Sequence, residues 1–310
     1  MQLFRLYFPT SGRGKQKKYD PERGIVFLHT PKTSGSALTR GLIAAIGPRS
    51  FVPAFDRAVY GSFDGFDTMA PETKGNLYLD VRDLPAGADF IAGHCAFSTF
   101  WSKYQDAQFV SFLREPVSRL LSFWLFWRAY TDDDLLPWGL WGDRVRLARK
   151  PLQDFLSSPE IACHTDNLVT RLLLWPDPLI PDGDFIDPRN DKALIRKAAA
   201  RLKRFAYVDV IENPSFLQSL EAWLGRPLTY PVVNQTKVTP PLLTTPLYQA
   251  LSPNALTLLD ERSRLDLSLW ATITEQRVTS LASAKLRERT LMRNIARHSD
   301  LLTHASRTNP

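Results

Sequence analysis

Hydroxyl, glycine and lysine residues gather directly after the first strongly apolar run of the chain. The run covers residues 24–29, and the segment HTPKTSGSA, residues 29–37, leads from it into a pattern typical of a helix over 37–46. A loop between a buried strand and a helix presents backbone N–H groups and the positive end of the helix dipole to an anion. Lys32 adds a mobile positive charge, and Gly35 allows close approach of the backbone. The segment therefore predicts a phosphate loop, and an ordinary capped helix start is the plainer alternative.

A second candidate phosphate site begins at Arg114, directly after the apolar run 108–113. At the carboxyl end of a strand, a guanidinium can clamp a phosphate with two hydrogen bonds. A helix is predicted over residues 117–130, and Ser118 and Ser122 share one face of it because they are four residues apart. The plainer alternative is that Arg114 caps a sheet edge and Ser122 is a small packing residue.

His94 lies between these two segments and follows a strand predicted over residues 89–92. An imidazole has a reference pKa of about 6.5, which suits a group that accepts a proton near neutrality. A lone histidine after a strand is more often structural, but the position between two phosphate segments favours a catalytic base. His29 is expected to orient the first loop, and His164, His298 and His304 are expected to be structural or solvated.

The elements that would position these groups alternate between strands and helices. This alternation predicts an α/β fold, a P-loop-like parallel sheet flanked by helices, whose ligands collect beyond the carboxyl ends of the strands. Residues 49–87 lack clean periodicity and are predicted to be irregular. The remaining predictions are helices at 162–174, 191–204 and 214–224, a strand at 205–211, a loop at 229–246, and a mostly helical region from residue 253 to near 297 with a basic tail over 285–307.

Composition places the chain among ordinary globular proteins. Its 310 residues are 44% hydrophobic and carry a net charge of +7, which suits an anionic partner or simply reflects a basic surface. Cys95 and Cys163 are too few for a disulfide framework and lack metal-site spacing, so a reducing compartment and no metal are expected. The sequence shows neither a secretory signal nor an integral membrane segment, which predicts a cytoplasmic location.

Aromatic residues crowd the helix that follows Arg114 and the segment beyond it. Stacking against a sugar is one interpretation, and packing in the core is favoured because aromatics at helical spacing usually pack together. The residues concerned are Phe123, Trp124, Phe126, Trp127, Trp138 and Trp141.

Together, the segments resemble the signatures of the carbohydrate sulfotransferase family that includes heparan sulfate 2-O- and 6-O-sulfotransferases. FLHTPKTSGSAL, residues 27–38, resembles the loop that binds the 5′-phosphosulfate of 3′-phosphoadenosine 5′-phosphosulfate (PAPS). FVSFLREPVSRLLSFW, residues 109–124, is similar to the strand and helix that bind its 3′-phosphate, and FIAGHCAFS, residues 90–98, to the segment with the catalytic base. Weaker similarity in DNLVTRLLL, FAYVDVIENPSFLQSLEAWLG and VNQTK extends the resemblance over roughly residues 24–270.

The resemblance implies a role for each matching residue. His94 would accept the proton of a hydroxyl acceptor, which the resemblance implies to be a saccharide or glycan, and Lys32 would neutralise the phosphate oxygens as the anhydride breaks. Arg114 and Ser122 would bind the 3′-phosphate. The 5′-phosphate would be held by the backbone of Thr33, Ser34, Gly35, Ser36 and Ala37.

The resemblance also implies a division of the chain. Residues 1–20 would be a flexible basic N-terminus, 21–270 the sulfotransferase domain, and 271–310 a helical, basic C-terminal extension that matches nothing in the family. Asn234 and Lys237 resemble a loop that closes over the adenosine, and Ser34 stands where many relatives have glycine or alanine.

Two other functions remain open from the sequence. A P-loop-type nucleotide kinase would use ATP and magnesium, but the chain lacks the Gly-x-x-x-x-Gly-Lys-Ser/Thr spacing of such enzymes. A catalytically idle anion-binding module would use the basic tail, although no nucleic-acid-binding motif is present and no nucleic-acid partner is expected.

Overall fold

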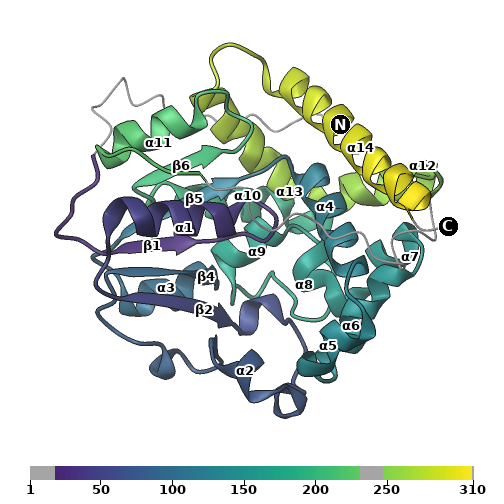
Figure 1. The fold of residues 1–310 in the computed structure, drawn as a ribbon, viewed down its shortest axis with the longest axis horizontal. Coiled ribbons are helices and arrows are strands. Elements are labelled where there is room, and N and C mark those ends of the chain that lie inside the picture. The colour runs from purple at the N-terminus through teal and green to yellow at the C-terminus, as the bar shows by residue number, and fades with distance from the viewer. Residues whose placement is uncertain (1–17, 231–246, 309–310) are drawn as a thin grey trace.

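The computed structural model describes residues 18–230 and 247–308, so the predictions for residues 1–17 and for Asn234 and Lys237 lie outside the described residues. The chain is an α/β protein built on a parallel sheet (Figure 1). The strands follow the order β3-β2-β4-β1-β5-β6 across the sheet. Their bounds are β1 Ile25–Leu28, β2 Phe51–Asp56, β3 Leu77–Tyr78, β4 Phe90–His94, β5 Gln108–Leu113 and β6 Tyr207–Val210.

The central strands are buried on both faces, as their continuous apolar sequences predict. On one face, Phe27 and Phe112 pack with Leu38 of α1 (Gly35–Ile46) and Leu220 of α11 (Phe216–Leu224). The other face is covered by α3 (Phe97–Lys103), α9 (Leu168–Leu174), α10 (Asp191–Leu202) and α13 (Pro253–Arg277). Because all strands are parallel, their carboxyl ends meet at one edge, where the candidate residues lie.

Helices fill the region beyond that edge. The first of them, α4 (Pro116–Arg128), begins at Pro116 after β5, and the buried Glu115 carboxylate accepts hydrogen bonds from the Val117 and Ser118 N–H groups. Its apolar side chains form a separate core with shorter helices. These are α5 (Asp132–Leu135), α6 (Trp141–Arg146), α7 (Leu152–Leu156), α8 (Ala162–Thr165) and α12 (Leu247–Ala250), and α2 (Pro71–Lys74) lies nearby.

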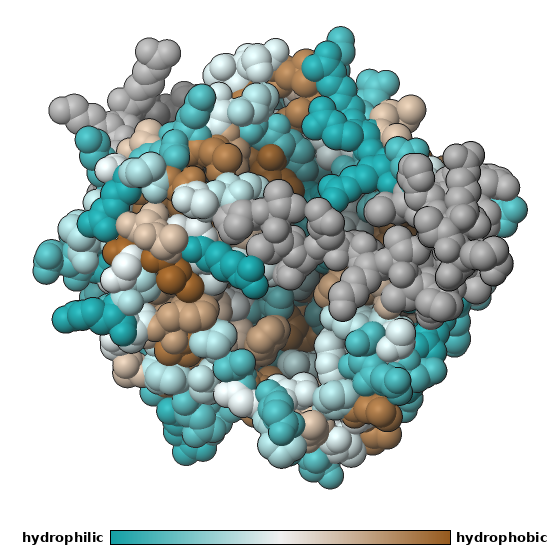
Figure 2. Space-filling view, viewed as in Figure 1, coloured by the Kyte–Doolittle hydropathy of each residue, from teal (hydrophilic) through white to brown (hydrophobic). Residues whose placement is uncertain are grey.

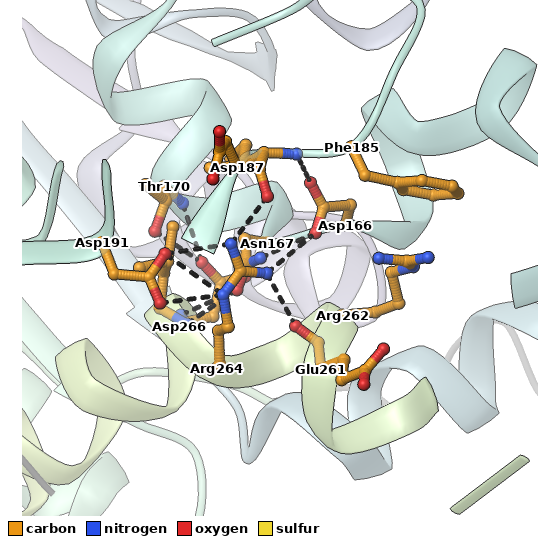
Figure 3. Close-up of polar contacts among 12 residues, drawn as sticks. Asp166, Asn167, Thr170, Phe185, Asp187, Asp191, Glu261, Arg262, Arg264 and Asp266 are labelled. Atoms are coloured by element: carbon orange, nitrogen blue, oxygen red, sulfur yellow. Dashed lines mark hydrogen bonds and ion pairs between the residues drawn. The ribbon is translucent and has the colours of Figure 1, made fainter. Parts of the chain in front are cut away.

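The C-terminal region is mostly helical, as predicted, and consists of α13 and α14 (Ser283–Thr308). Figure 1 shows α14 running along the outside of the molecule past α4, and it packs against α4, α12 and α13. A buried polar network fixes α13 to α9, and Figure 3 shows Asp266 of α13 among the residues at the start of α9.

Two sequence-based predictions were wrong in detail. Residues 49–87 contain β2, which pairs with β4 from Phe51 opposite Phe90 to Phe55 opposite His94. Pro53 and the partial exposure of β2 hid its strand pattern. The helix predicted over 162–174 is divided into α8 and α9, because Asn167 adopts a left-handed backbone with φ of 49°.

Candidate phosphate and catalytic site

The first phosphate segment is a tight loop between β1 and α1. Lys32 and Ser34 both have positive φ, 68° and 63°, and Ser34 is the N-cap residue of α1. The helix's own hydrogen bonds begin with the Leu38 N–H, which donates to the Ser34 carbonyl at 3.1 Å. The N–H groups of residues 35–37 therefore lie at the positive end of the helix dipole, as the sequence predicted.

The His29 side chain packs directly against residue 35 of the loop, and this contact explains why residue 35 is glycine. A Cβ atom on Gly35 would lie 1.7 Å from Nε2 of His29, so any larger residue would collide with the imidazole. Burial, together with the nearby His94 and Lys32, lowers the pKa of His29 well below its ordinary value. His29 is therefore held neutral directly beneath the loop, in agreement with its predicted orienting role.

The Thr33 hydroxyl braces the loop. The side chain is fully buried, and its Oγ1 donates to the Thr30 carbonyl at 2.8 Å. Ser34 is exposed and Ser36 is half-buried. The predicted contacts of residues 33–37 with a 5′-phosphate through backbone N–H groups remain predictions.

His94 is the last residue of β4 and lies against His29. The two imidazole ring centroids are 4.3 Å apart, and Phe55 meets the His94 ring edge-on at 5.2 Å. Nδ1 of His94 lies 2.5 Å from the His29 carbonyl oxygen. Because a carbonyl oxygen can only accept, Nδ1 carries the proton in neutral His94, which leaves the lone pair on Nε2. The geometry thus fixes the tautomer that a base acting through Nε2 requires.

The surroundings of His94 make it a weaker base than free imidazole. Burial lowers its pKa to about 4, and the hydrogen bond with His29 opposes this only in part. The sequence-based expectation of an ordinary histidine pKa is therefore wrong. His94 is half-buried and remains neutral throughout the physiological range.

Asp56, which the sequence did not single out, holds the backbone that follows His94. Its buried carboxylate accepts from the Ala96 N–H at 2.8 Å and from the Ala58 N–H at 3.0 Å. Burial raises the pKa of Asp56 to about 6. Recognition of β2 in the sequence would have placed Asp56 at the same sheet edge as His94.

Arg114 follows β5, as predicted, and contacts the phosphate loop. Its Nη1 donates to the Lys32 carbonyl at 3.1 Å, and its Nη2 donates to Oδ1 of Asn294, which comes from α14. Both partners are neutral acceptors, so the guanidinium charge is not neutralised by either hydrogen bond.

Lys32 extends from the loop toward α4. Its ammonium lies 4.0 Å from the centre of the Phe126 ring, a distance typical of a cation–π interaction. Burial, together with the charges of Arg114 and Arg297, lowers the pKa of Lys32 to about 8. Lys32 is thus a partly buried cation near two others.

Ser122 lies in the second turn of α4 and is buried, with 8% exposure. One turn earlier, Ser118 is fully buried, and its hydroxyl has no hydrogen-bond partner in the described part of the chain. Next to it, Arg119 is buried and its Nη2 donates to the His164 carbonyl at 3.4 Å. Burial lowers the pKa of Arg119 to about 10.

Most of the aromatic residues around α4 belong to the core, as the favoured interpretation predicted. Phe123, Trp124, Trp127 and Trp141 are at most 4% exposed, and His164 stacks on Phe123 with ring centroids 4.9 Å apart. Phe126 and Trp138 are half-buried, and Phe126 contacts Lys32.

Residues 18–230 and 247–308 contain neither a candidate metal site nor a candidate membrane-spanning helix. No group of three or more histidine, cysteine, aspartate or glutamate side chains in these ranges could hold a metal ion. None of the helices there has the length and apolar character needed to cross a membrane. Cys95 and Cys163 are both buried and unbridged.

Comparisons with known proteins do not assign the chain to a family. No family model and no curated protein sequence matches the chain. Among solved structures, the chain is similar to a sulfotransferase from Alicyclobacillus acidocaldarius, at 16% identity and a TM-score of 0.33, over 80% of this chain and 98% of the other. A similarity this low carries no argument for a function.

Proposed function

We propose that the protein is a sulfotransferase that moves a sulfuryl group from PAPS to a hydroxyl. The observation that carries the proposal is that His94, Lys32 and Arg114 meet at the carboxyl ends of three adjacent strands, β4, β1 and β5. A neutral base, a mobile cation and a guanidinium at this edge are the groups that sulfuryl transfer from a nucleotide needs. The resemblance of all three segments to one family supports the same function.

The residues fit a donor that carries two separate phosphate groups. Lys32 and the N-terminus of α1 would hold the 5′-phosphosulfate, and Arg114 would hold the 3′-phosphate. Ser122 would assist Arg114, and the unpartnered hydroxyl of Ser118 lies one turn from it. The hydrogen bond between Arg114 and the Lys32 carbonyl sets the spacing between these two subsites.

His94 would act on the acceptor. Its Nε2 would take the hydroxyl proton as the acceptor oxygen forms a bond to sulfur, while the bond from sulfur to the 5′-phosphate oxygen breaks. The departing phosphate would gain negative charge, which Lys32 is positioned to neutralise. The His29 carbonyl would stabilise the imidazolium that forms, since it accepts from Nδ1. Protein groups alone would complete this transfer.

The chemical class of the acceptor follows only from the family resemblance, which implies a saccharide or glycan. Incubation of the protein with isotopically labelled PAPS and a cell extract, followed by mass spectrometry, would identify the product. Sulfated saccharides are the expected products, and sulfated lipid or peptide hydroxyls would redirect the acceptor assignment.

The choice of nucleotide distinguishes a sulfotransferase from a kinase. We expect 3′-phosphoadenosine 5′-phosphate (PAP) to raise the melting temperature, because a ligand that binds only the folded state stabilises it. ATP with magnesium should have a smaller effect, since it lacks the 3′-phosphate. The reverse order, with stabilisation by ATP and magnesium and none by PAP, would overturn the proposed function.

A further inference from the structure

The C-terminal helix α14 forms one wall of a cavity beside Arg114. The cavity has a volume of about 670 Å³ and lies between α14 and the segment that follows β6. Three arginines of α14 line it together with Arg114. The residues that line the cavity include Arg114, Glu212, Arg289, Arg293, Asn294 and Arg297.

The arginines are arranged in a row along one face of the helix. Arg289, Arg293 and Arg297 are spaced four residues apart, and Lys285 continues the row one turn earlier. Like charges at this spacing repel one another and destabilise an isolated helix. Figure 2 shows hydrophilic residues over the part of the surface where Figure 1 places α14. A bound anion would relieve the repulsion within the row.

Two contacts join α14 to the residues that follow β5. Asn294 accepts a hydrogen bond from Arg114, and Arg287 donates to the buried Glu115 carboxylate at 3.3 Å. Leu286 is buried, with 8% exposure. These contacts place the arginine row beside the candidate 3′-phosphate site, although α14 follows Arg114 by about 180 residues in the chain.

Cations outnumber available carboxylates at this position. Burial is the main cause that lowers the pKa of Lys32, Arg114 and His298, and the nearby charge of Arg297 acts in the same direction on all three. For Arg114, the charges of Glu212 and Glu115 oppose this lowering. His298 is 6% exposed, and its Nδ1 has no hydrogen-bond partner within the described ranges. The cluster therefore has the electrostatic character of an anion site.

The acidic groups nearby are already engaged. Glu212 accepts from the Glu115 N–H at 2.9 Å and from Trp270 Nε1 at 3.1 Å, and Glu115 caps α4. Burial raises the pKa of Glu212 to about 7, so its negative charge is only partly present at neutral pH. Glu212 therefore opposes an anion in the cavity less than an ordinary glutamate would.

We propose that Arg297 and Arg293 complete the 3′-phosphate site of the nucleotide, so that the C-terminal helix is part of the donor-binding machinery. This inference rests on the proposed function. The phosphate would accept from Arg114 and from the α14 arginines, and Arg114 would exchange its hydrogen bond with Asn294 for one with the phosphate. The C-terminal extension would thereby select nucleotides that carry a 3′-phosphate.

The test is isothermal titration of PAP and of adenosine 5′-phosphosulfate, which lacks the 3′-phosphate, into the full chain. The double variant Arg293→Gln, Arg297→Gln should lose roughly 10- to 100-fold in PAP affinity, as expected for charged hydrogen bonds. Its affinity for adenosine 5′-phosphosulfate should change by less than about threefold. Lys285→Gln removes the same charge from the same row outside the cavity, and it should leave both affinities within about twofold.

The outcomes distinguish the two proposals. Unchanged PAP affinity in the double variant, with tight binding to the unmodified protein, would overturn the role of α14 and leave the proposed function standing. Failure of the unmodified protein to bind PAP would overturn both. Arg293 and Arg297 are exposed, so we expect the melting temperature without ligand to stay unchanged. If the double variant nevertheless unfolds, the single variant Arg297→Gln provides the test. Normal PAP affinity in this single variant would overturn the proposal.

Discussion

Two polar regions of this protein differ in how the charges of their side chains are compensated. In the network of Figure 3, the carboxylates of Asp166 and Asp191 pair with arginines, and Asp266 accepts backbone N–H groups. In the candidate site, Lys32, Arg114 and Arg297 lie near one another, and Arg114 hydrogen-bonds only to neutral acceptors among the contacts described above. The network is balanced within the protein, whereas the site would be balanced by an anionic ligand.

The network is built for stability. Asp166 pairs with Arg171 at 2.8 Å and lies 3.6 Å from Arg264, which also pairs with Asp191 at 2.9 Å. Asp266 accepts from the Val169 and Thr170 N–H groups and so caps α9 from a distant helix. Removal of Asp166 would leave the buried charge of Arg171 without its carboxylate partner, which is strongly destabilising.

The candidate site has the features expected of a binding surface. Its cations are partly desolvated, several of its polar atoms lack a partner in the described ranges, and backbone conformations at Lys32 and Ser34 are strained. Natural proteins keep such arrangements where function needs them. The comparison therefore predicts that substitutions in the site change activity or affinity, while those in the network change the free energy of unfolding.

The largest effect is expected for His94→Ala. Loss of a general base should lower turnover by about 10²–10⁴-fold, while PAP affinity and melting temperature stay near those of the unmodified protein. His164→Ala is the matched control, because it removes a buried histidine from the aromatic core and should lower the melting temperature instead. Full activity in a folded His94→Ala protein would remove His94 from the mechanism.

The pH profile sharpens the same assignment. His94 must be neutral to accept a proton, and its pKa lies at about 4, so kcat/KM should fall only as the pH drops toward this value. This acidic fall in kcat/KM should be absent from the residual activity of His94→Ala. A fall in kcat/KM near pH 6.5 that persists in the variant would point to a different base.

The next largest effect is expected in the balanced network. Asp166→Ala removes the partner of Arg171 and should destabilise the fold by about 3–5 kcal/mol, because the guanidinium would stay buried and unpaired. Chemical denaturation would measure this loss. Asp132→Ala breaks only the exposed contacts with Arg146 and Arg149, so its effect on the free energy of unfolding should be much smaller. Equal costs for the two variants would contradict the structural role of the network.

Arg114→Ala should have an intermediate effect, confined to ligand binding. Loss of charged hydrogen bonds to the 3′-phosphate should weaken PAP binding by roughly 10- to 100-fold. The affinity for adenosine 5′-phosphosulfate should change much less, so the preference of the variant for PAP should be reduced to the part that the α14 arginines supply. Calorimetry that shows an undiminished preference for PAP would assign the 3′-phosphate to residues other than Arg114.

The sequence predicted the parts of this site that depend on local pattern. The continuous apolar runs identified β1 and β5, and the proline after Arg114 marked the start of α4. The alternation of strands and helices predicted that the loop, His94 and Arg114 lie at the carboxyl edge of a parallel sheet. In the structure, the Lys32 carbonyl of the loop accepts from Arg114, and His94 contacts the His29 carbonyl.

Other features depend on contacts between distant segments. The break between α8 and α9 is stabilised by Asp266, which follows Asn167 by 99 residues. Arg114 donates a hydrogen bond to Asn294, which follows it by 180 residues, and no local sequence pattern predicts that contact. The lowered pKa of His94 likewise arises from its burial in the folded chain. Such features follow from tertiary packing, so a reading of local periodicity could not supply them.

The smallest predicted effect concerns Ser34, which has φ of 63° at the N-cap of α1 and makes no side-chain capping hydrogen bond. A left-handed conformation costs an L-residue about 1–2 kcal/mol, and glycine avoids this cost but loses about 0.4–1 kcal/mol through its freer unfolded chain. Ser34→Gly should therefore stabilise the protein by up to about 1 kcal/mol in chemical denaturation. Ser36→Gly makes the same change inside α1, where it should instead destabilise by about 0.5–1 kcal/mol. Turnover should remain normal in Ser34→Gly, because the backbone N–H groups assigned to the phosphate keep their positions. A loss of turnover without a loss of stability would show that the Ser34 hydroxyl itself contacts the donor.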